Sequence, residues 1–233
     1  MGAGRSTDGG AVGVRRGLRP GPRAHRRRSD RARAGRARAG GAACLLYTSL
    51  QVSTSGERLA ELRLQSARIA AGEVIEAEGA WDRLHALLAT GTCALALGLG
   101  ERVLKMTGEY TGKREQFGYP IATFQAVAVQ TADRYIDLRA MEATLWQAAW
   151  RIASGAPGAL PAAGDVAVAK IWAAEGVRRV VQTAQHLHGG FGADTDYPLH
   201  RYHAWAKHLE LALGPAAAYE ETLGDLLAAH PLS

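Results

Sequence analysis

Three segments carry residue types that a plain helical bundle does not need, and the first is KREQFG at positions 113–118. It contains Arg114, Gln116 and Phe117 and is followed by Gln125. An arginine in the last turn of a helix interacts favourably with the helix dipole whatever else it does. Arg114 taken alone is therefore compatible with either a ligand site or an ordinary helix end.

The second segment is AQHLHGGFG at 184–192, where two histidines precede the pair Gly189 and Gly190. A single glycine after a helix is a common cap. Two in succession let the backbone approach a flat or phosphorylated ligand closely, because no Cβ stands in the way. The pair indicates a ligand site of that kind.

The third segment is DYPLHRYHAWAKHLEL at 196–211, which is crowded with aromatic rings and histidines. His200, His203 and His208 do not form a His-Glu-x-x-His zinc motif. Cys44 and Cys93 have no ligand spacing to a partner either. We therefore expect no metal site, and we expect this segment to be a helix with packed aromatic rings.

Apolar residues recur at helical spacing from Ala80 onward, with Pro and Gly between the repeats. Four long or medium helices and a short last one are expected, and short loops between helices indicate an antiparallel bundle. The expected helices begin near Ala80, Pro120, Asp165 (as N-cap), Pro198 and Pro215. The first of these helices is expected to carry one apolar face, formed by Leu84, Leu88, Leu95, Leu99 and Met106.

The residues before the helices fall into two parts, 1–50 and 51–78. Twelve arginines lie between Arg5 and Arg38 against only Asp8 and Asp30, with few branched or aromatic side chains, so we interpret 1–50 as a disordered extension. It could be a nucleic-acid arm, a transit peptide or an artefact without function. The last interpretation is favoured because no aromatic residues alternate with the arginines. Residues 57–71 alternate imperfectly and predict one or two short strands.

Taken in order, REQFG, IATFQ, AKIWAAEGVRRVVQTAQHLHGGFG and DYPLHRY resemble the C-terminal domain of the acyl-CoA dehydrogenase family. The resemblance covers about residues 57 to 225. It implies that 51–78 are closing strands of the family's β domain and that 79–230 form its helical, FAD-binding domain. The N-terminal helical domain and most of the β domain are missing, so we interpret the chain as an N-terminally truncated or short family member.

The resemblance also implies a chemistry. Family members bind FAD between subunits and oxidise an acyl-CoA thioester to the 2,3-enoyl-CoA, with electron-transferring flavoprotein as the usual acceptor. By position, Arg114, Gln116 and Phe117 match the segment that contacts the neighbouring subunit's FAD, where an arginine fork suits a pyrophosphate. Gln125, four residues into the next helix, matches a glutamine that contacts the cofactor. Gly189 and Gly190 match a glycine pair on the adenine and ribose side of the cofactor. His186 stands at the place of the glutamine that precedes this pair in the family, and Gln185 lies one residue before that place.

The family's catalytic base is where the resemblance fails. The usual glutamate position corresponds to Leu213, and the alternative position on the first long helix corresponds to Leu88. A leucine cannot take a proton. Glu210 and Glu220 could serve only if the alignment contained a gap, and Glu210 is expected to face solvent.

A missing base predicts a subunit that completes a partner's flavin site, as in actinobacterial relatives that act on steroid side chains and pair a catalytic with a non-catalytic subunit in a heterotetramer. Two alternatives remain: a homomeric dehydrogenase with a relocated glutamate, and a truncated helical remnant without activity. The sequence predicts a cytoplasmic protein, since it shows no secretory signal, no apolar membrane-spanning stretch and no probable disulfide.

Overall fold

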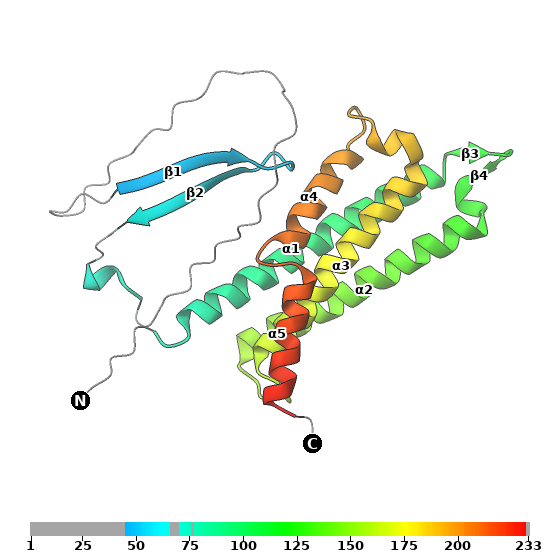
Figure 1. Cartoon of the computed structure of the whole chain (residues 1–233). Coiled ribbons are helices and arrows are strands. Elements are labelled where there is room, and N and C mark those ends of the chain that lie inside the picture. Colours follow the sequence, from blue (N-terminus) through cyan, green and yellow to red (C-terminus); the bar gives the residue numbers. More distant parts are fainter. Residues whose placement is uncertain (1–44, 66–69, 76, 232–233) are drawn as a thin grey trace, which may run out of the picture. The chain divides into compact units, whose positions relative to one another are not determined.

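The computed structural model describes residues 45–65, 70–75 and 77–231 (Figure 1). Within them the chain forms a β-hairpin, a bundle of α-helices and a few short 3-10 turns. The predicted fold class, a mainly helical bundle preceded by a short piece of sheet, is confirmed. The first 44 residues of the predicted extension lie outside the described part.

The β-hairpin consists of β1, Leu45–Val52, and β2, Arg58–Gln65. The strands pair antiparallel, from Leu45 opposite Gln65 to Val52 opposite Arg58. β2 falls within the segment predicted to be extended. β1 begins ahead of the boundary expected at residue 50, because LLYTSLQV is rich in leucine, tyrosine, threonine and valine and suits a strand.

Five α-helices form the bundle, with α3 in contact with each of the other four. α1, α2 and α3 run up, down and up in turn, and α4 and α5 follow one another back down (Figure 1). The short loops and the apolar periodicity therefore predicted the topology correctly. The bounds are α1 Ala80–Thr111, α2 Gln125–Ser154, α3 Ala162–His188, α4 Leu199–Leu211 and α5 Ala216–Ala229.

The buried face of α1 is not the leucine face that the sequence predicted. Leu84, Leu88 and Leu95 are 47%, 49% and 63% exposed, and of the predicted stripe only Met106 is fully buried. The residues that face the core are mostly small: Ala89, Cys93, Ala96, Gly100, Val103, Met106 and Thr107. Small side chains let neighbouring helices approach closely: a Cβ on Gly100 would lie 2.7 Å from Cδ2 of Leu138.

α1 is also long and apolar enough to cross a membrane by length and composition alone, which the sequence analysis did not expect. The same test is passed by core helices of soluble proteins. α1 contacts α2, α3 and α4 along its small-residue face, and 33% of its apolar window is buried.

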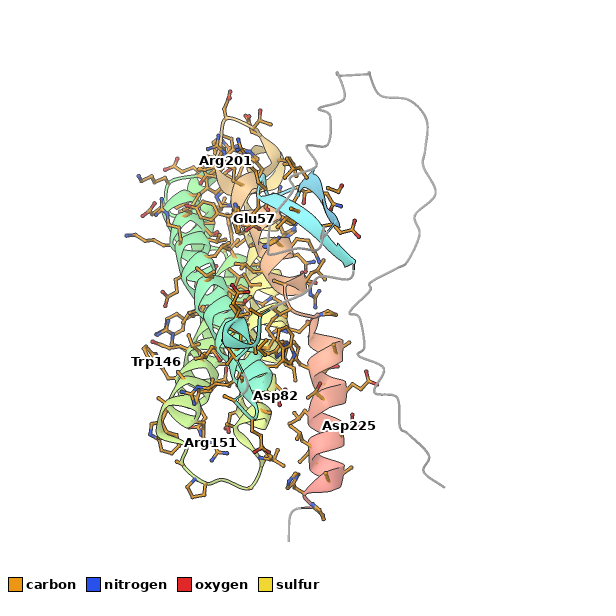
Figure 2. The ribbon with its side chains drawn as sticks, turned by 90° about the vertical axis from the view of Figure 1, so that its left-hand side faces the viewer. Glu57, Asp82, Trp146, Arg151, Arg201 and Asp225 are labelled. Carbon is orange, nitrogen blue, oxygen red and sulfur yellow. The ribbon has the colours of Figure 1, made fainter. Side chains whose placement is uncertain are left out.

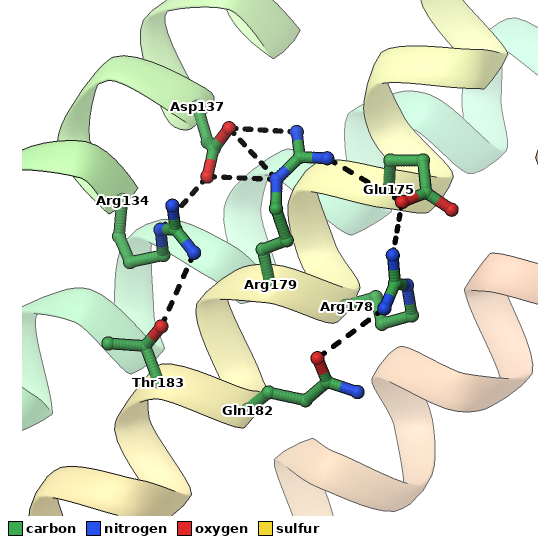
Figure 3. A network of polar contacts seen from close by, with 7 residues as sticks. All are labelled: Arg134, Asp137, Glu175, Arg178, Arg179, Gln182 and Thr183. Carbon is green, nitrogen blue, oxygen red and sulfur yellow. Dashed lines mark hydrogen bonds and ion pairs between the residues drawn. The ribbon is translucent and has the colours of Figure 1, made fainter. Parts of the chain in front are cut away.

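A polar network joins α2 to α3 (Figure 3). Asp137 of α2 is buried, and it accepts from Arg179 of α3 at 2.8 Å and pairs with Arg134 at 3.0 Å. Glu175 pairs with both Arg178 and Arg179. A buried carboxylate is stable in this position because two guanidinium groups satisfy it.

The loop between α2 and α3 is held by Arg151, which is only 4% exposed. Its guanidinium donates to Asp165 at 2.8 Å and to the carbonyls of Ala156 and Leu160. α3 begins at Ala162, so Asp165 lies inside the first turn and is not the N-cap that the sequence predicted. Figure 2 shows Arg151 at the opposite end of the bundle from Arg201, at the start of α4.

Candidate cofactor site

A tight hairpin projects where α1 ends. Its strands are β3, Glu115–Gln116, and β4, Tyr119–Pro120. The two residues between them, Phe117 and Gly118, have φ values of 56° and 80°, as a type I′ turn requires. Left-handed backbone is unfavourable for phenylalanine by about 1–2 kcal/mol. The strained turn holds the Phe117 ring outward, where it is 90% exposed.

Arg114 and Gln116 flank this turn. The backbone of Arg114 accepts from the Ile121 amide at 2.8 Å, which fixes the base of the hairpin. Its side chain is exposed, and within the described residues no hydrogen bond or ion pair engages the guanidinium. The Gln116 side chain donates to the Glu115 carbonyl. Arg114 is thus free to bind an anion.

Gln125 is the first residue of α2, whereas the sequence placed it four residues inside that helix. A 3-10 turn, Ile121–Thr123, takes up the intervening residues, and Phe124 is the N-cap. Gln125 is exposed. Phe124 also meets the Phe117 ring edge-on at 6.3 Å between centroids, so this turn lies against the hairpin tip.

The second predicted cofactor segment lies at the end of α3. Gly189 has φ 59° and ψ −140°, a conformation that only glycine adopts readily. Its carbonyl accepts from the Gln185 side chain at 3.2 Å, and a Cβ on Gly189 or Gly190 would meet nothing within 4 Å. His186 is exposed. The glycine backbone is therefore open to an approaching ligand.

Four rings packed against one another bring these two segments to the same end of the bundle. Tyr110 of α1 lies 4.3 Å from His188 of α3 and 5.6 Å from Phe191, measured between ring centroids. Tyr197 packs on both His188 and Phe191. We call Tyr110, His188, Phe191 and Tyr197 the ring cluster. Sequence reasoning missed it, because its members come from three separate segments, and Tyr110 and Tyr197 stand apart from the predicted site residues that His188 and Phe191 adjoin.

The family's usual base position lies far from this end. Leu213 follows α4, whose 13 residues span about 20 Å. It has φ 59° and is 42% exposed, and its carbonyl accepts from the Tyr219 hydroxyl at 3.0 Å. Leu88, at the alternative position, is a half-exposed residue of α1. No proton acceptor occupies either position.

A buried cation that the sequence analysis did not single out holds the loop around Leu213. Lys170 of α3 is 0% exposed, and its ammonium donates to the carbonyls of Gly214 at 3.0 Å, Glu210 at 3.2 Å and Leu209 at 3.4 Å. Burial lowers the pKa of Lys170 from its ordinary value. Burial likewise raises the pKa of the nearby Cys93 thiol to about 11, so this thiol is not a nucleophile at neutral pH.

The two glutamates considered as substitute bases lie in different surroundings. The Glu210 side chain is only 13% exposed and pairs with Lys207 at 2.6 Å, so the expectation that it faces solvent is wrong. Glu220 is exposed on α5. Within the described ranges, no group of three or more histidine, cysteine or acidic side chains is placed to hold a metal ion.

Comparison with known proteins shows which family this chain resembles. The family description "Acyl-CoA dehydrogenase, C-terminal domain" matches residues 86–225. Acyl-CoA dehydrogenase FadE27 of Mycobacterium tuberculosis is 43% identical over 174 residues, which are 73% of this chain and 47% of that protein. The chain therefore spans about half the length of the relatives it matches.

Solved structures give the same result. A chain of the ChsE4-ChsE5 complex from Mycobacterium tuberculosis superposes with a TM-score of 0.75 at 41% identity, over 80% of this chain and 50% of that one. A variant of the steroid ACAD Tcur3481-Tcur3483 superposes with a TM-score of 0.72 at 38% identity, over 80% of this chain and 52% of that one. On the family match and these shared helices, the chain belongs to the acyl-CoA dehydrogenase family.

Proposed function

We propose that this chain is part of an FAD-dependent acyl-CoA dehydrogenase, as a subunit that lacks its own base and completes a partner's flavin site. The observation that carries the proposal is the contrast between the two ends of α4. At one end Arg114, Phe117, Gly189 and Gly190 are exposed and unobstructed, and at the other Leu213 stands at the base position.

The residues at the open end fit FAD. Arg114 offers unengaged guanidinium donors for a pyrophosphate. Gly189 and Gly190 leave room for backbone groups to approach the nucleotide, and Gln185 or His186 lies beside them. Phe117 and Gln116 project on the hairpin tip, and Gln125 begins the next helix. Bound FAD would supply the acceptor for the hydride that leaves the β carbon of the thioester.

The α proton of the thioester requires a carboxylate from elsewhere. Leu213 cannot take it, and Glu210 is held in an ion pair with Lys207. Glu220 lies on α5, after the loop that contains Leu213. The proposal therefore assigns proton abstraction to a glutamate outside this chain, on a related catalytic subunit.

An unpartnered face of α2 supports assembly with such a subunit. Tyr135, Ile136, Trp146 and Trp150 are 57%, 63%, 66% and 53% exposed. Tyr135 and Ile136 also line an apolar groove of about 560 Å³ between α1 and α2. Exposed apolar surface of this kind marks interaction sites. We propose a homo- or heterotetramer, with a heteromer favoured by the two-component relatives.

The names of the relatives suggest the substrate. The steroid ACAD is similar over most of this chain, so a steroid side-chain acyl-CoA is our proposed substrate class, with a fatty acyl-CoA as the alternative. Electron-transferring flavoprotein is the proposed acceptor. A reducing compartment such as the cytoplasm suits the unpaired, buried Cys93.

The visible absorption spectrum of the purified full chain tests this function, alone and after co-expression with a dehydrogenase subunit encoded beside it. We expect flavin only in the co-expressed sample, at less than one per chain, and bleaching on anaerobic addition of an acyl-CoA. Flavin in the lone chain that is bleached by substrate would instead establish the homomeric enzyme, and Glu210→Gln and Glu220→Gln would then locate its base. Absence of flavin from both samples would favour a non-enzymatic helical remnant.

A further inference from the structure

We propose that His188 is a positioning residue for the Gly189–Gly190 segment, acting as a neutral imidazole that carries its proton on Nδ1 and accepts the Tyr197 hydroxyl on Nε2. The functional part of this inference, toward FAD, rests on the proposed function. The structural part rests on the ring cluster alone.

The hydrogen-bond partners assign the proton. Nδ1 of His188 lies 2.8 Å from the Ala184 carbonyl, which can only accept, so Nδ1 must carry a hydrogen. Nε2 lies 3.1 Å from the Tyr197 hydroxyl. A hydroxyl can donate to a neutral nitrogen, so one tautomer satisfies both ends of the ring. His188 is 3% exposed, and an unsatisfied nitrogen there would be unfavourable.

The charge on the two partners agrees with this assignment. Burial lowers the pKa of His188 below its ordinary 6.5 and raises that of Tyr197 above 10. Glu109 and Tyr110 of α1 also raise the pKa of Tyr197, and Arg102 opposes them. At neutral pH the imidazole is therefore uncharged and the phenol keeps the hydrogen that it donates.

The ring connects directly to the glycine segment. Gly189–Ala193 form a 3-10 turn that folds back over His188, and a Cβ on Gly192 would lie 3.0 Å from Cβ of His188. Phe191 of the same turn stacks on Tyr110 and packs at a tilt against Tyr197. Because His188 is bonded to α3 on one side and to Tyr197 on the other, it fixes the path of the backbone at Gly189 and Gly190.

The test uses the full chain with ¹⁵N-labelled histidine and three variants. Tyr197→Phe removes only the hydroxyl, and His188→Phe keeps a ring without nitrogen. His230→Phe is the matched control, since His230 makes the same bond from Nδ1 to a carbonyl four residues earlier, but at an exposed position at the end of α5. The readouts are the tautomer by NMR, amide exchange over residues 188–193, and FAD affinity in the presence of the partner subunit.

We expect the Nδ1-protonated tautomer in the unmodified protein and a titration below pH 6.5. Loss of one buried hydrogen bond should speed amide exchange over 188–193 and weaken FAD binding by about 5- to 10-fold in Tyr197→Phe. His230→Phe should change neither. FAD affinity should fall as pH drops through the His188 pKa, because the protonated ring no longer accepts, and His188→Phe should lack this dependence.

An Nε2-protonated ring would overturn the inference, as would unchanged exchange in Tyr197→Phe. Faster exchange with unchanged FAD affinity would limit His188 to a structural role and so contradict positioning of the cofactor. Failure of the unmodified assembly to bind FAD would contradict the proposed function instead, while NMR and exchange would still decide whether His188 holds the glycine segment. Tyr197→Phe keeps the test valid if His188→Phe does not fold.

Discussion

Lys170 shows how backbone carbonyls can satisfy the hydrogen bonds of a single buried charge. Its ammonium has three hydrogens, and the carbonyls of Leu209, Glu210 and Gly214 accept them. Two of those carbonyls belong to the last turn of α4, where the helix dipole favours a cation. The Tyr219 ring lies 5.6 Å away and adds a cation–π contact. Lys170 therefore fixes the loop that contains Leu213.

Replacing Lys170 with Met should lower the free energy of unfolding by about 1–3 kcal/mol at pH 7, because the buried carbonyls lose their donor. Denaturant unfolding measures the change. Lys105→Met at an exposed position of α1 is the control and should stay within about 0.5 kcal/mol. A Lys170→Met variant as stable as the control would show that water replaces the ammonium.

The same comparison has a pH dependence. The unfolded chain binds the Lys170 proton more tightly than the folded protein does, because burial lowers the folded pKa. Stability from this group is therefore reduced at neutral pH and recovers as pH rises from the folded pKa toward 10.5. The stability difference between the unmodified protein and Lys170→Met should widen over that window.

Among the elements, the helices differ in how closely they pack. A Cβ on Gly176 of α3 would lie 2.5 Å from Sδ of Met141, whereas one on Gly91 of α1 would meet nothing within 4 Å. Gly176→Ala should cost about 1–3 kcal/mol through overpacking. Gly91→Ala should gain about 1 kcal/mol from helix propensity. Thermal unfolding of the two variants should move in opposite directions, and shifts of the same sign would contradict the packing described for α3.

Helix positions were predictable from sequence because Pro and Gly separate strongly periodic segments. The buried face of α1 was not, because hydrophobicity ranks leucine above alanine, while the close approach of α3 selects small residues such as Ala89 and Ala96. The 3-10 turn before Gln125 leaves no distinct signal in IATFQ. Burial of Glu210 depends on neighbours in space, including Arg178 of α3, that spacing along the chain does not reveal.

For the whole molecule, the exposed face of α2 decides whether the proposed assembly forms. Ile136→Glu places a charge on that face and should lower the molecular mass of the assembly, measured by light scattering, from that of the oligomer to that of a smaller species. Leu227→Glu on α5 is the control, since Leu227 is also exposed, at 40%, but lies on another helix. Equal effects of the two substitutions would argue against α2 as the contact.

The uncovered leucines of α1 have a consequence for the life of the protein before it assembles. Trp81, Leu84, Leu87 and Leu88 are each close to half exposed or more, and contiguous apolar surface promotes aggregation. If this face is not covered by another segment of a longer chain or by another subunit, we expect the protein to aggregate through it. The amount of soluble protein should therefore depend on the amount of the covering segment or subunit that is made with it.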